Sequence, residues 1–556
     1  MEKRVFLAIF LCFVVLAVYQ AYFAPKPAPD LAATAAGTPP RSASAPAPGV
    51  TTPVPPRPTS VVSGATPLVT DAGARDIVVE TDAIRAVFTT AGAAVRSWKL
   101  KHYFDSEHQP LELVPTDIPD SFPRPFTLAT DDAPISATIA TALYQPSATG
   151  LALSSAPGTL SFEYRDSSGL SARKTFHFQP EGKPYLVTVD ASVDVNGASR
   201  PVVIEWGPAL GLGYNPDGSR EAPRRAVQLR DDKVERLLAP KLQDQPRYEG
   251  VLRFAGAEDQ YFLSAVLPGE KPVRVEYQPI TLPVPNDQKG RSRTFVGYSV
   301  RVPDAASLTF FMGPKDLDVL RSVDPQLVRV IDFGIFALLV VPLLQALKWI
   351  NGFVGNYGWS IVLLTIFINL AIFPLRHRSM VSMRKMQALQ PQVKAIQDRY
   401  AKYKMTDPER GKMNQEMMAL YKQKGVNPAS GCVPMLLTIP ILYAFYNLLS
   451  SSIELRGAPF LGWIHDLSLR DPYYITPVFM GATMLLQQRM MPSTADPVQQ
   501  KMFLLMPVVF TAMFLWAPSG LVIYWLMSNI MAIGQQYVTN RLIGGPPPTL
   551  SRAKAS

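Results

Sequence analysis

The chain alternates between long uncharged runs and mixed, soluble-type sequence. Residues 5–23 are apolar apart from Gln20, and further apolar runs follow only after about residue 330. Charged, polar and apolar positions are mixed between them. Because a membrane-spanning helix needs ~20 largely apolar residues, the first run is about long enough for one span. The pattern predicts a membrane protein with a large soluble domain between its first and its later helices.

Two interpretations of the first run are open, a cleaved signal peptide and an uncleaved signal anchor. Lys3 and Arg4 precede the run and suit both. Its end carries Tyr19, Tyr22 and Phe23, where a signal peptidase requires small residues. Aromatic side chains there fit the membrane–water interface. We favour the anchor, which places the N-terminus in the cytoplasm because its positive flank stays inside.

The segment after the first run changes composition twice. Residues 24–67 contain 12 prolines in 44 positions, together with Ala, Ser and Thr, and therefore predict an extended, disordered tether that ends near Asp71. From about residue 75 to 315, short runs rich in Val, Phe, Tyr and Thr alternate with Gly, Pro, Asp and Asn clusters. This alternation predicts a large antiparallel β-sandwich on the outer side of the membrane.

The C-terminal part predicts a helical membrane core. Residues 333–347 are uncharged but too few for a comfortable span, so an amphipathic helix in the outer interface is favoured, and a true span stays open. Five better candidates follow and make six spans with the first run. They cover residues 359–375, 426–449, 473–486, 502–516 and 521–537.

Charge predicts the orientation of these spans. The net charge is +10, and residues 376–424 hold 12 Lys/Arg against 4 Asp/Glu. The positive-inside rule places this segment in the cytoplasm, the mixed loop 450–472 outside, and the short tail with Arg541 inside. Both termini are therefore expected in the cytoplasm.

The basic segment has a helical pattern of its own. Met386, Leu389, Val393 and Ile396 recur at spacings of three and four, as in a coiled-coil seam. Asp407 followed by Pro408 predicts the start of a second helix. We expect an antiparallel helical hairpin over residues 377–424, whose basic candidate contacts are Arg384, Lys385, Lys394 and Arg399.

The absence of certain residue types and motifs narrows the possible functions of the chain. The five C-terminal spans, as bounded above, contain no Asp, Glu, Lys, Arg or His, whereas ion-coupled transporters place ionisable residues in the membrane. Nucleotide-binding loops, metal-ligand clusters and nucleophile elbows are also missing, and Cys12 and Cys432 lie far apart in apolar runs. We therefore predict neither an enzyme, a cofactor nor a metal site.

Two features of the spans have a structural and a functional interpretation. Uncharged polar residues such as Thr365 and Asn369 either join helices by hydrogen bonds or line a hydrated groove. Of 19 methionines, 17 lie between Met380 and Met531, where flexible thioethers either fill gaps in the core or contact varied apolar partners. The residues alone leave both alternatives open.

The C-terminal half resembles the YidC family of membrane protein insertases in its long Gram-negative form. The matching stretches occur in order over residues 330–541. They include Gly355-Asn356-Tyr357-Gly358-Trp359-Ser360, Lys385-Met386-Gln387-Ala388-Leu389-Gln390-Pro391, Gln415-Glu416-Met417-Met418-Ala419-Leu420-Tyr421, Trp463-Ile464-His465-Asp466-Leu467, Asp471-Pro472-Tyr473-Tyr474 and Pro518-Ser519-Gly520-Leu521. Upstream, Asp259-Gln260-Tyr261-Phe262 and Gly313-Pro314-Lys315 also look like this form.

The resemblance implies a fold and a mechanism. The fold is a five-helix insertase core and an outer β-supersandwich, anchored by the first helix in the inner membrane. A polar groove open to the cytoplasm is expected at Thr365, Asn369, Trp525 and Gln535. An apolar slide for incoming segments is expected on two helices, at Met435, Ile439, Tyr443, Phe445, Phe503, Met506, Phe510 and Phe514. Expected partners are nascent membrane proteins, the Sec translocon with its accessory subunits, the ribosome through the cytoplasmic loops, and the bilayer.

One position departs from the family pattern. The groove of the family usually carries a positive residue on the second span, and the matching position here is Asn369. We therefore expect insertion to depend little on acidic residues of the client, and Asn369→Arg to be tolerated. Two rival functions are a small-solute transporter or channel, which the missing membrane charges disfavour, and sugar binding by the β domain, which fold resemblance alone cannot support.

The predicted organisation follows from these segments. It comprises the signal anchor (1–23), the tether (24–70), the periplasmic β-sandwich (71–320), the insertase core with its interfacial helix, five spans and hairpin (321–541), and a short basic cytoplasmic tail (542–556).

Overall fold

The structure is a computed structural model that describes most of the chain after residue 64. The described residues are 65–105, 108–115, 119, 122–208, 210, 224–283, 292–302, 306–403, 407–426, 433–490 and 497–543. The predicted signal anchor, most of the predicted tether and all but the first two residues of the predicted tail lie outside these ranges.

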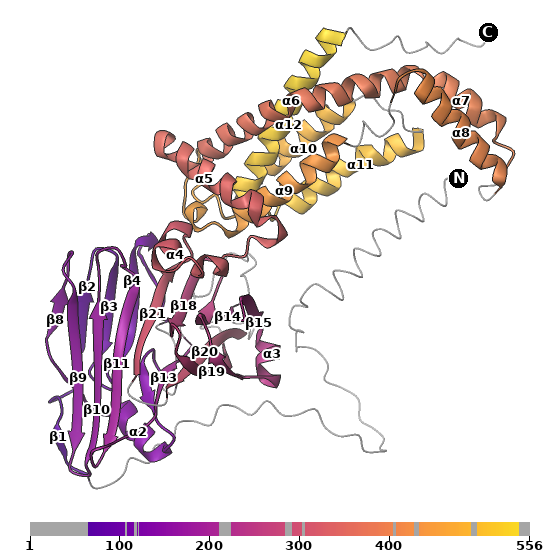
Figure 1. The fold of residues 1–556 in the computed structure, drawn as a ribbon. Helices are drawn as coiled ribbons and strands as arrows, with labels where there is room; N and C mark the ends of the chain where they lie inside the picture. The colour runs from indigo at the N-terminus through magenta and orange to yellow at the C-terminus, as the bar shows by residue number, and fades with distance from the viewer. Residues whose placement is uncertain are drawn as a thin grey trace, which may run out of the picture. The chain divides into compact units, whose positions relative to one another are not determined.

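The first part of the described chain is rich in β-strands. Its largest sheet has the order β1-β9-β10-β11-β21-β18-β17-β14-β15, and two five-stranded sheets have the orders β16-β19-β20-β13-β6 and β5-β4-β3-β2-β8. The long strands β9, β10 and β11 run side by side in Figure 1. The strands are β1 (Pro67–Val69), β2 (Asp76–Glu80), β3 (Ile84–Thr89), β4 (Ala94–Phe104), β5 (Pro110–Glu112), β6 (Thr127–Ala129), β7 (Gln145–Pro146), β8 (Gly150–Ala152), β9 (Gly158–Asp166), β10 (Leu170–Phe178), β11 (Leu186–Val195), β12 (Ala198–Ser199), β13 (Val202–Trp206), β14 (Arg225–Arg230), β15 (Lys233–Leu237), β16 (Arg247–Val251), β17 (Phe254–Glu258), β18 (Phe262–Leu267), β19 (Pro272–Pro283), β20 (Ser292–Val302) and β21 (Ala306–Pro314).

The end of the predicted tether is part of this β region. Strand β1 pairs antiparallel with β9, with Pro67 opposite Asp166 and Val69 opposite Arg165. A proline is compatible with this position because β1 lies at the edge of its sheet, where one side of the strand needs no partner. Residues 67–69, which the sequence analysis assigned to the tether, therefore form a strand of the β region.

Strand alternation explains how the β core forms. Along β10 the inward positions are Leu170, Ala172, Lys174, Phe176 and Phe178, and all five are buried. Lys174 fits this apolar layer because its ammonium donates to the carbonyl oxygens of Gly92, Ala93 and Phe126 at 2.6–2.8 Å. A buried ammonium needs such acceptors, since losing its hydration is costly.

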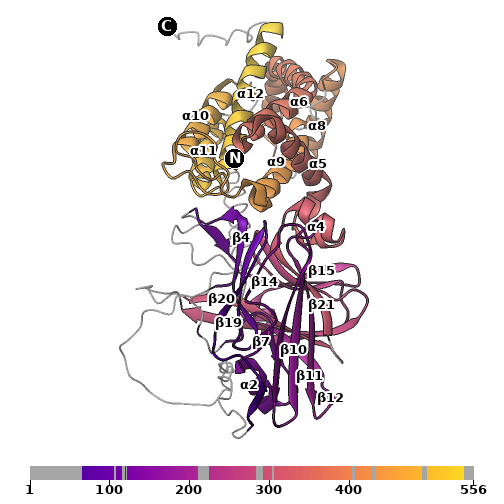
Figure 2. The same cartoon turned by 90° about the vertical axis from the view of Figure 1, so that its left-hand side faces the viewer.

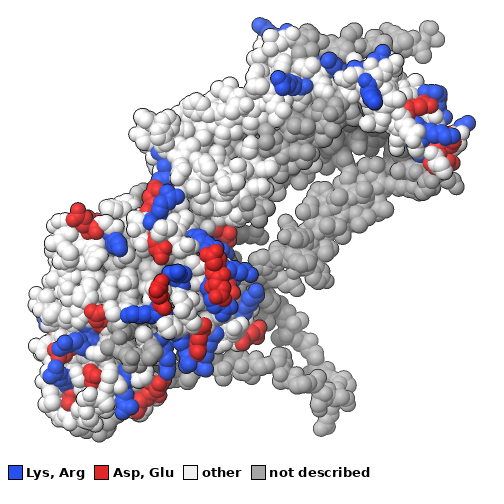
Figure 3. Space-filling view, viewed as in Figure 1, with Lys and Arg blue, Asp and Glu red and all other residues white. Residues whose placement is uncertain are grey.

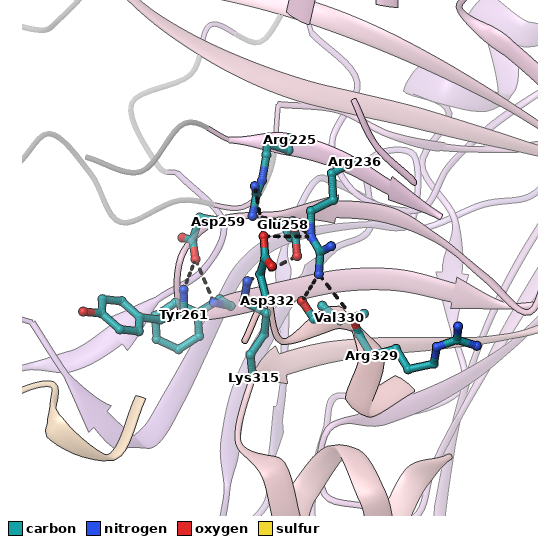
Figure 4. A network of polar contacts seen from close by, with 10 residues as sticks. Arg225, Arg236, Glu258, Asp259, Tyr261, Lys315, Arg329, Val330 and Asp332 are labelled. Carbon is teal, nitrogen blue, oxygen red and sulfur yellow. Dashed lines mark hydrogen bonds and ion pairs between the residues drawn. The ribbon is translucent and has the colours of Figure 1, made fainter. Parts of the chain in front are cut away.

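A buried carboxylate joins three strands to the segment that leads to the C-terminal helices (Figure 4). Glu258, at the end of β17, is fully buried and lies 2.9 Å from Arg225, 3.2 Å from Arg236 and 3.2 Å from Lys315. Arg236 also donates to the carbonyl oxygen of Val330 at 2.8 Å. One acid thereby holds β14, β15 and the end of β21 around residues 329–332.

The second part of the described chain is helical. Three short helices, α2 (Ala133–Thr141), α3 (Ala239–Asp244) and α4 (Leu317–Val323), still belong to the β region or follow its last strand. The later helices are α5 (Ala337–Val354), α6 (Tyr357–Ala388), α7 (Gln390–Arg399), α8 (Pro408–Gln423), α9 (Val433–Ser451), α10 (Ile475–Met490), α11 (Pro497–Phe514) and α12 (Ser519–Ile543).

Two of the later helices are longer than the hydropathy pattern predicted. Within the described residues, α5 and α6 are long and apolar enough to cross a membrane. The α5 helix has 18 residues, so its length permits a span, and the two alternatives, an interfacial helix and a true span, both stay open. The α6 helix continues to Ala388, well beyond the predicted end at Leu375, because charged residues end an apolar run without ending a helix.

Local signals set the helix ends. Gly355 ends α5 with a positive φ of 68°, which glycine adopts without strain, and Asn356 then caps α6 by accepting a hydrogen bond from the Trp359 amide at 3.1 Å. Asp407 caps α8 in the same way, which confirms the predicted start at Pro408.

Charged side chains are unevenly distributed over these helices. On the face shown in Figure 3, Lys, Arg, Asp and Glu cover the β region and reappear at the end of α6 and on α7 and α8. The surface over the helices between them is almost free of charge. An uncharged band of this kind suits contact with lipid hydrocarbon.

The Glu258 network leads to a stability prediction. We expect Glu258→Ala to lower the free energy of unfolding by about 3–5 kcal/mol, because it leaves buried cations without their counter-charge. The matched control is Glu249→Ala, which removes an exposed pair with Arg274 and should cost less than about 1 kcal/mol. Urea unfolding of the full chain in detergent, followed by tryptophan fluorescence, measures both. Equal losses would contradict the role given to Glu258.

Candidate functional site

The α6 and α12 helices pack against each other through polar side chains, although both helices are mostly apolar. They lie side by side in both ribbon views (Figures 1 and 2). Thr365 and Asn369 on α6 are buried, as are Gln535 and Thr539 on α12. Amides and hydroxyls in such surroundings must find partners, because an unpaired buried polar group costs about 1–3 kcal/mol.

Asn369 and Gln535 form the centre of this interface. The Asn369 side-chain amide donates to the carbonyl oxygen of Thr365 at 2.8 Å, and the Gln535 amide donates to the carbonyl oxygen of Asn369 at 2.8 Å. Both NH₂ groups are therefore engaged with α6 backbone. Both side-chain oxygens are left to accept a hydrogen bond from elsewhere.

The donor to these two oxygens is a residue that the sequence analysis left outside the spans. Arg376 Nη1 donates to Asn369 Oδ1 at 3.2 Å and to Gln535 Oε1 at 3.1 Å. Its side chain points back along α6, over the turn on its N-terminal side, as helical side chains do. Arg376 therefore brings a positive charge to Asn369 and Gln535 from a position seven residues further along the same helix.

The same face of α6 continues to contact α12 beyond Arg376. His377 Nδ1 lies 3.1 Å from Thr539 Oγ1, and Arg384 donates to the side-chain oxygen of Asn540. Arg384 is therefore a contact between α6 and α12, whereas it was predicted as part of the hairpin surface.

A second set of amides joins α12 to α10. Asn529 donates to the carbonyl oxygen of Met480 at 3.3 Å and to the Thr483 hydroxyl at 3.2 Å. Gln536 donates to the carbonyl oxygen of Met490 at 3.0 Å. At the α10–α12 contact, these polar residues therefore form hydrogen bonds between helices, which is the structural one of the two interpretations.

Trp525, predicted to line the groove with Asn369, lies in an aromatic cluster. Its ring is 5.6 Å from Phe510 and 4.9 Å from Phe514, between ring centroids. The neighbouring Tyr524 stacks on Phe445 at 4.2 Å, which closes α9 against α12. Thr365, Asn369 and Gln535 thus come together, and Trp525 joins the side chains predicted for the slide.

The predicted slide residues divide by exposure. Tyr443 and Met506 are exposed, with 44% and 43% of their surface accessible, whereas Phe445 and Phe514 are buried. The helices α9 and α11 also carry Met435, Ile439 and Phe503, whose side chains lie outside the described residues.

The hairpin residues lie on paired helices. Arg399 forms an ion pair with Glu416 at 2.8 Å, and the Tyr400 hydroxyl donates to the same carboxylate at 2.8 Å, which links α7 to α8. Lys385 and Lys394 are exposed. This surface can offer positive charge to a partner.

A buried acid in the loop before α10 has a structural role that the sequence did not reveal. Asp471 accepts hydrogen bonds from the Thr476 amide and hydroxyl, both at 2.7 Å, from the Tyr473 amide at 3.0 Å, and from the Trp463 indole at 2.9 Å. Burial opposes its ionisation, but these four donors hold the pKa of Asp471 below its usual value. The motif pair Trp463 and Asp471 therefore fixes this loop.

Comparison with known proteins identifies the family to which the chain belongs. A family model described as "60Kd inner membrane protein" matches residues 349–545. A second model, described as "YidC periplasmic domain", matches residues 76–346. Membrane protein insertase YidC of Geobacter sulfurreducens is 36% identical over 485 residues, which cover 84% of this chain and 86% of that protein. The chain belongs to the YidC family of membrane protein insertases.

Further relatives agree with this family. Membrane protein insertase YidC of Geotalea uraniireducens is 35% identical over 557 residues, which cover 97% of this chain and 99% of that protein. A solved structure titled "Active YidC insertase crystal structure with the first transmembrane domain resolved" is 18% identical, covers 85% of this chain and 95% of its own, and has a TM-score of 0.34.

Family membership settles the general function. The chain is an inner-membrane insertase with a periplasmic domain and a helical membrane core, and its substrates are membrane proteins that enter the bilayer. The resemblance seen in the motifs is thereby confirmed. Within this insertase, the polar α6–α12 interface is the candidate functional site.

Two substitutions of polar residues in this interface should lower the stability of the fold by unequal amounts. We expect Gln535→Leu to lower the free energy of unfolding by about 1–3 kcal/mol, because the Asn369 carbonyl and Arg376 each lose a partner in a buried place. Thr365→Val should cost less than about 1 kcal/mol, since the Thr365 hydroxyl donates only to the nearby Ile361 carbonyl oxygen at 2.6 Å. Thermal unfolding in detergent compares the two. A larger loss for Thr365→Val would contradict the central place of Gln535.

Proposed function

We propose that the polar α6–α12 interface is the floor of a hydrated groove, open to the cytoplasm, that receives the hydrophilic part of a client while its apolar segment enters the bilayer. The observation that carries this proposal is the cluster of Thr365, Asn369, Arg376 and Gln535 within helices whose other positions are largely apolar. In this arrangement six helices span the membrane, counting the N-terminal anchor, and both termini are cytoplasmic.

The physical reason for such a groove is the cost of polar groups in hydrocarbon. Each backbone amide or carbonyl that enters lipid without a hydrogen-bond partner costs several kcal/mol, roughly. A groove lined by amides and hydroxyls shortens the apolar path that these groups must cross. The burial of apolar client side chains, worth ~25 cal/mol per Å², drives the step without ATP, a cofactor or a catalytic group.

The apolar part of the path runs along α9 and α11. Both helices present large apolar side chains at their surface, among them Tyr443 on α9 and Val508, Val509 and Met513 on α11. Flexible and branched side chains of this kind accept varied apolar segments. Phe445 and Phe514 pack into the interior and are proposed to hold the two helices rather than to touch clients.

Partners follow from charge. The exposed Lys385, Lys394 and neighbouring basic residues of α7 and α8 suit a weak contact with the ribosome, whose RNA is anionic. Insertion beside the Sec translocon and its accessory subunits is proposed from the resemblance of the motifs alone.

A small-solute transporter or channel is the rival function. Arg376 weakens the argument from missing charge, because this ionisable side chain of α6 reaches the buried Asn369 and Gln535. Purified protein in vesicles decides between the two functions. We expect insertion of a small two-span client without flux of ions or small solutes, and flux without insertion would overturn the proposal.

The slide leads to a prediction about contact sites. Photo-crosslinkers placed at Tyr443 and at Val509 should form adducts with a stalled, ribosome-bound client, because both positions are exposed on the proposed path. The matched controls are Phe445 and Phe514, on the same two helices but buried, which should give few adducts. Adducts at the buried positions and none at the exposed ones would contradict the proposed path.

A further inference from the structure

Three carboxylates surround one ammonium group where the chain passes from β21 to the helical core. Lys348 Nζ, on α5, lies 3.4 Å from Asp316 Oδ2 and 3.3 Å from Glu454 Oε1. It also donates a hydrogen bond to Asp318. Asp316 caps α4, Asp318 lies in its first turn, and Glu454 belongs to η4 (Ile453–Leu455), a 3₁₀ helix after α9. The cluster therefore joins three elements and contains more negative than positive charge.

Glu454 is the least well satisfied of the three acids. Its side chain is only 6% exposed, compared with 15% for Asp316 and 61% for Asp318. Its Oε1 atom is shielded from solvent and, within the described residues, has the ion-pair contact with Lys348 but no hydrogen bond. Asp316, by contrast, accepts hydrogen bonds from the amides of Asp318 and Val319. A buried carboxylate without such donors is costly as long as it is ionised.

The groups that face this cluster determine how readily Glu454 ionises. They are the acids Asp316 and Asp318 of α4, the ammonium of Lys348 on α5, and the phenols of Tyr103 on β4 and Tyr357 on α6. Burial raises the pKa of Glu454, and the charge of Asp316 raises it further, whereas Lys348 opposes both effects. The buried acid therefore binds a proton more tightly than the same acid would in water.

The segment that carries Glu454 also holds the end of α9. Asn447, in the last turns of α9, donates a hydrogen bond to the carbonyl oxygen of Phe333 at 3.1 Å. Gln260, between β17 and β18, donates to the carbonyl oxygen of Ser450 at 2.5 Å. These two contacts involve no ionisable group, whereas the contact made by Glu454 depends on its protonation.

The cluster lies on the periplasmic side and close to the proposed client path. Asp316 and Asp318 belong to the residues 76–346 that match the periplasmic domain of the family. Tyr443, an exposed residue of the path, lies eight residues before the end of α9, which is about 12 Å along a helix that rises 1.5 Å per residue. Movement at the end of α9 would therefore reach the surface that clients are proposed to contact.

We propose that Glu454 is a positioning residue of the insertion path, that it fixes the periplasmic end of α9 against α4 and α5, and that protons on this side of the membrane tighten the contact. The inference rests on the proposed path along α9. A protonated Glu454 no longer carries a buried charge or repels Asp316, and Lys348 keeps two carboxylates as partners. An ionised Glu454 attracts Lys348, but it must be held in a buried place beside a second acid.

The direction of the pH effect follows from the raised pKa. The contact is strongest below the usual pKa of a glutamate, where Glu454 is protonated whether the segment is docked or released. It weakens as the pH rises through the raised pKa, because the docked acid must then lose a proton that it binds more tightly than the released acid does. Glu454→Gln imitates the protonated acid, so it should keep the contact strong from pH 5 to pH 8.

Hydrogen exchange of the full-length protein in vesicles measures the contact. The amides of residues 447–456 report its opening, and comparison with Glu454→Gln at the same pH cancels the pH dependence of the exchange chemistry. We expect equal exchange at pH 5 and at least about three-fold faster exchange in the wild type at pH 8. The matched control is Gln260→Leu, which removes an uncharged contact with the same segment and should speed exchange over the wild type by one factor at both pH values.

Insertion of a small two-span client into the same vesicles tests the positioning role, with equal pH on both sides so that no gradient acts. Relative to Glu454→Gln, we expect the wild type to insert about two-fold more slowly at pH 8 and equally fast at pH 5. Lys348→Met leaves three acids without their cation and should be about five-fold slower than the wild type at pH 8 but recover most of its rate at pH 5. Lys348→Arg, which keeps the charge, should restore the rate at pH 8.

The outcomes separate this proposal from the proposed function. If the wild type inserts no client at any pH, the proposed function fails, whereas hydrogen exchange still tests the contact. If exchange of wild type and Glu454→Gln keeps one ratio from pH 5 to pH 8, the proton-dependent contact is wrong. If exchange changes with pH but insertion by these variants does not follow it, Glu454 has a structural role alone and the positioning role is overturned. A Lys348→Met protein that fails to fold leaves the decision to Glu454→Gln.

Discussion

The cost of removing a polar or charged group from water controls this structure more than any other interaction. It applies in the β region, where Lys174 is buried only because three carbonyl oxygens surround its ammonium, and where Glu258 is buried among three cations. It applies again between α6 and α12, where every described bond of Asn369 and Gln535 satisfies a group that would otherwise be unpaired. Apolar packing supplies most of the stability, but these polar contacts determine which residues face one another.

The same constraint connects the β region to the first membrane-directed helix. The chain leaves β21 through Lys315, which pairs with Glu258, and passes residues 329 and 330, whose carbonyl oxygens bind Arg236. Further along, Lys348 on α5 lies within ion-pair distance of Asp316 and Glu454, at 3.4 Å and 3.3 Å. Burial raises the pKa of Glu454, and the nearby Asp316 charge adds to this effect, whereas Lys348 opposes it. Ion pairs therefore hold both ends of the segment that joins the β region to α5. Lys315 pairs with Glu258 at its start, and Lys348 pairs with Asp316 and Glu454 at its end.

In the membrane core, the cost of removing polar groups from water also bears on function. An insertase must bring polar chain into contact with the bilayer without paying the full desolvation cost, so it needs partners that are already oriented. The amides of Asn369 and Gln535 are oriented by backbone carbonyls, and they in turn orient Arg376. In the proposed groove, groups positioned in this way need little reorganisation to bind polar chain, which favours rapid and repeated use by different clients.

Much of this protein could be predicted from its sequence. Hydrophobic periodicity and strand alternation determined the β region and the helical membrane core, because these depend on local composition and on transfer into lipid. Local capping residues such as Asp407 gave helix starts for the same reason. The cytoplasmic side, inferred from the excess of Lys and Arg in residues 376–424, stays a prediction. The partners of Asn369 could not be predicted, since Arg376 lies beyond the apolar run and Gln535 lies 166 residues away. Tertiary packing also decided that Phe445 and Phe514 face the interior while Tyr443 and Met506 are exposed, because an almost wholly apolar helix does not reveal which of its sides packs against protein.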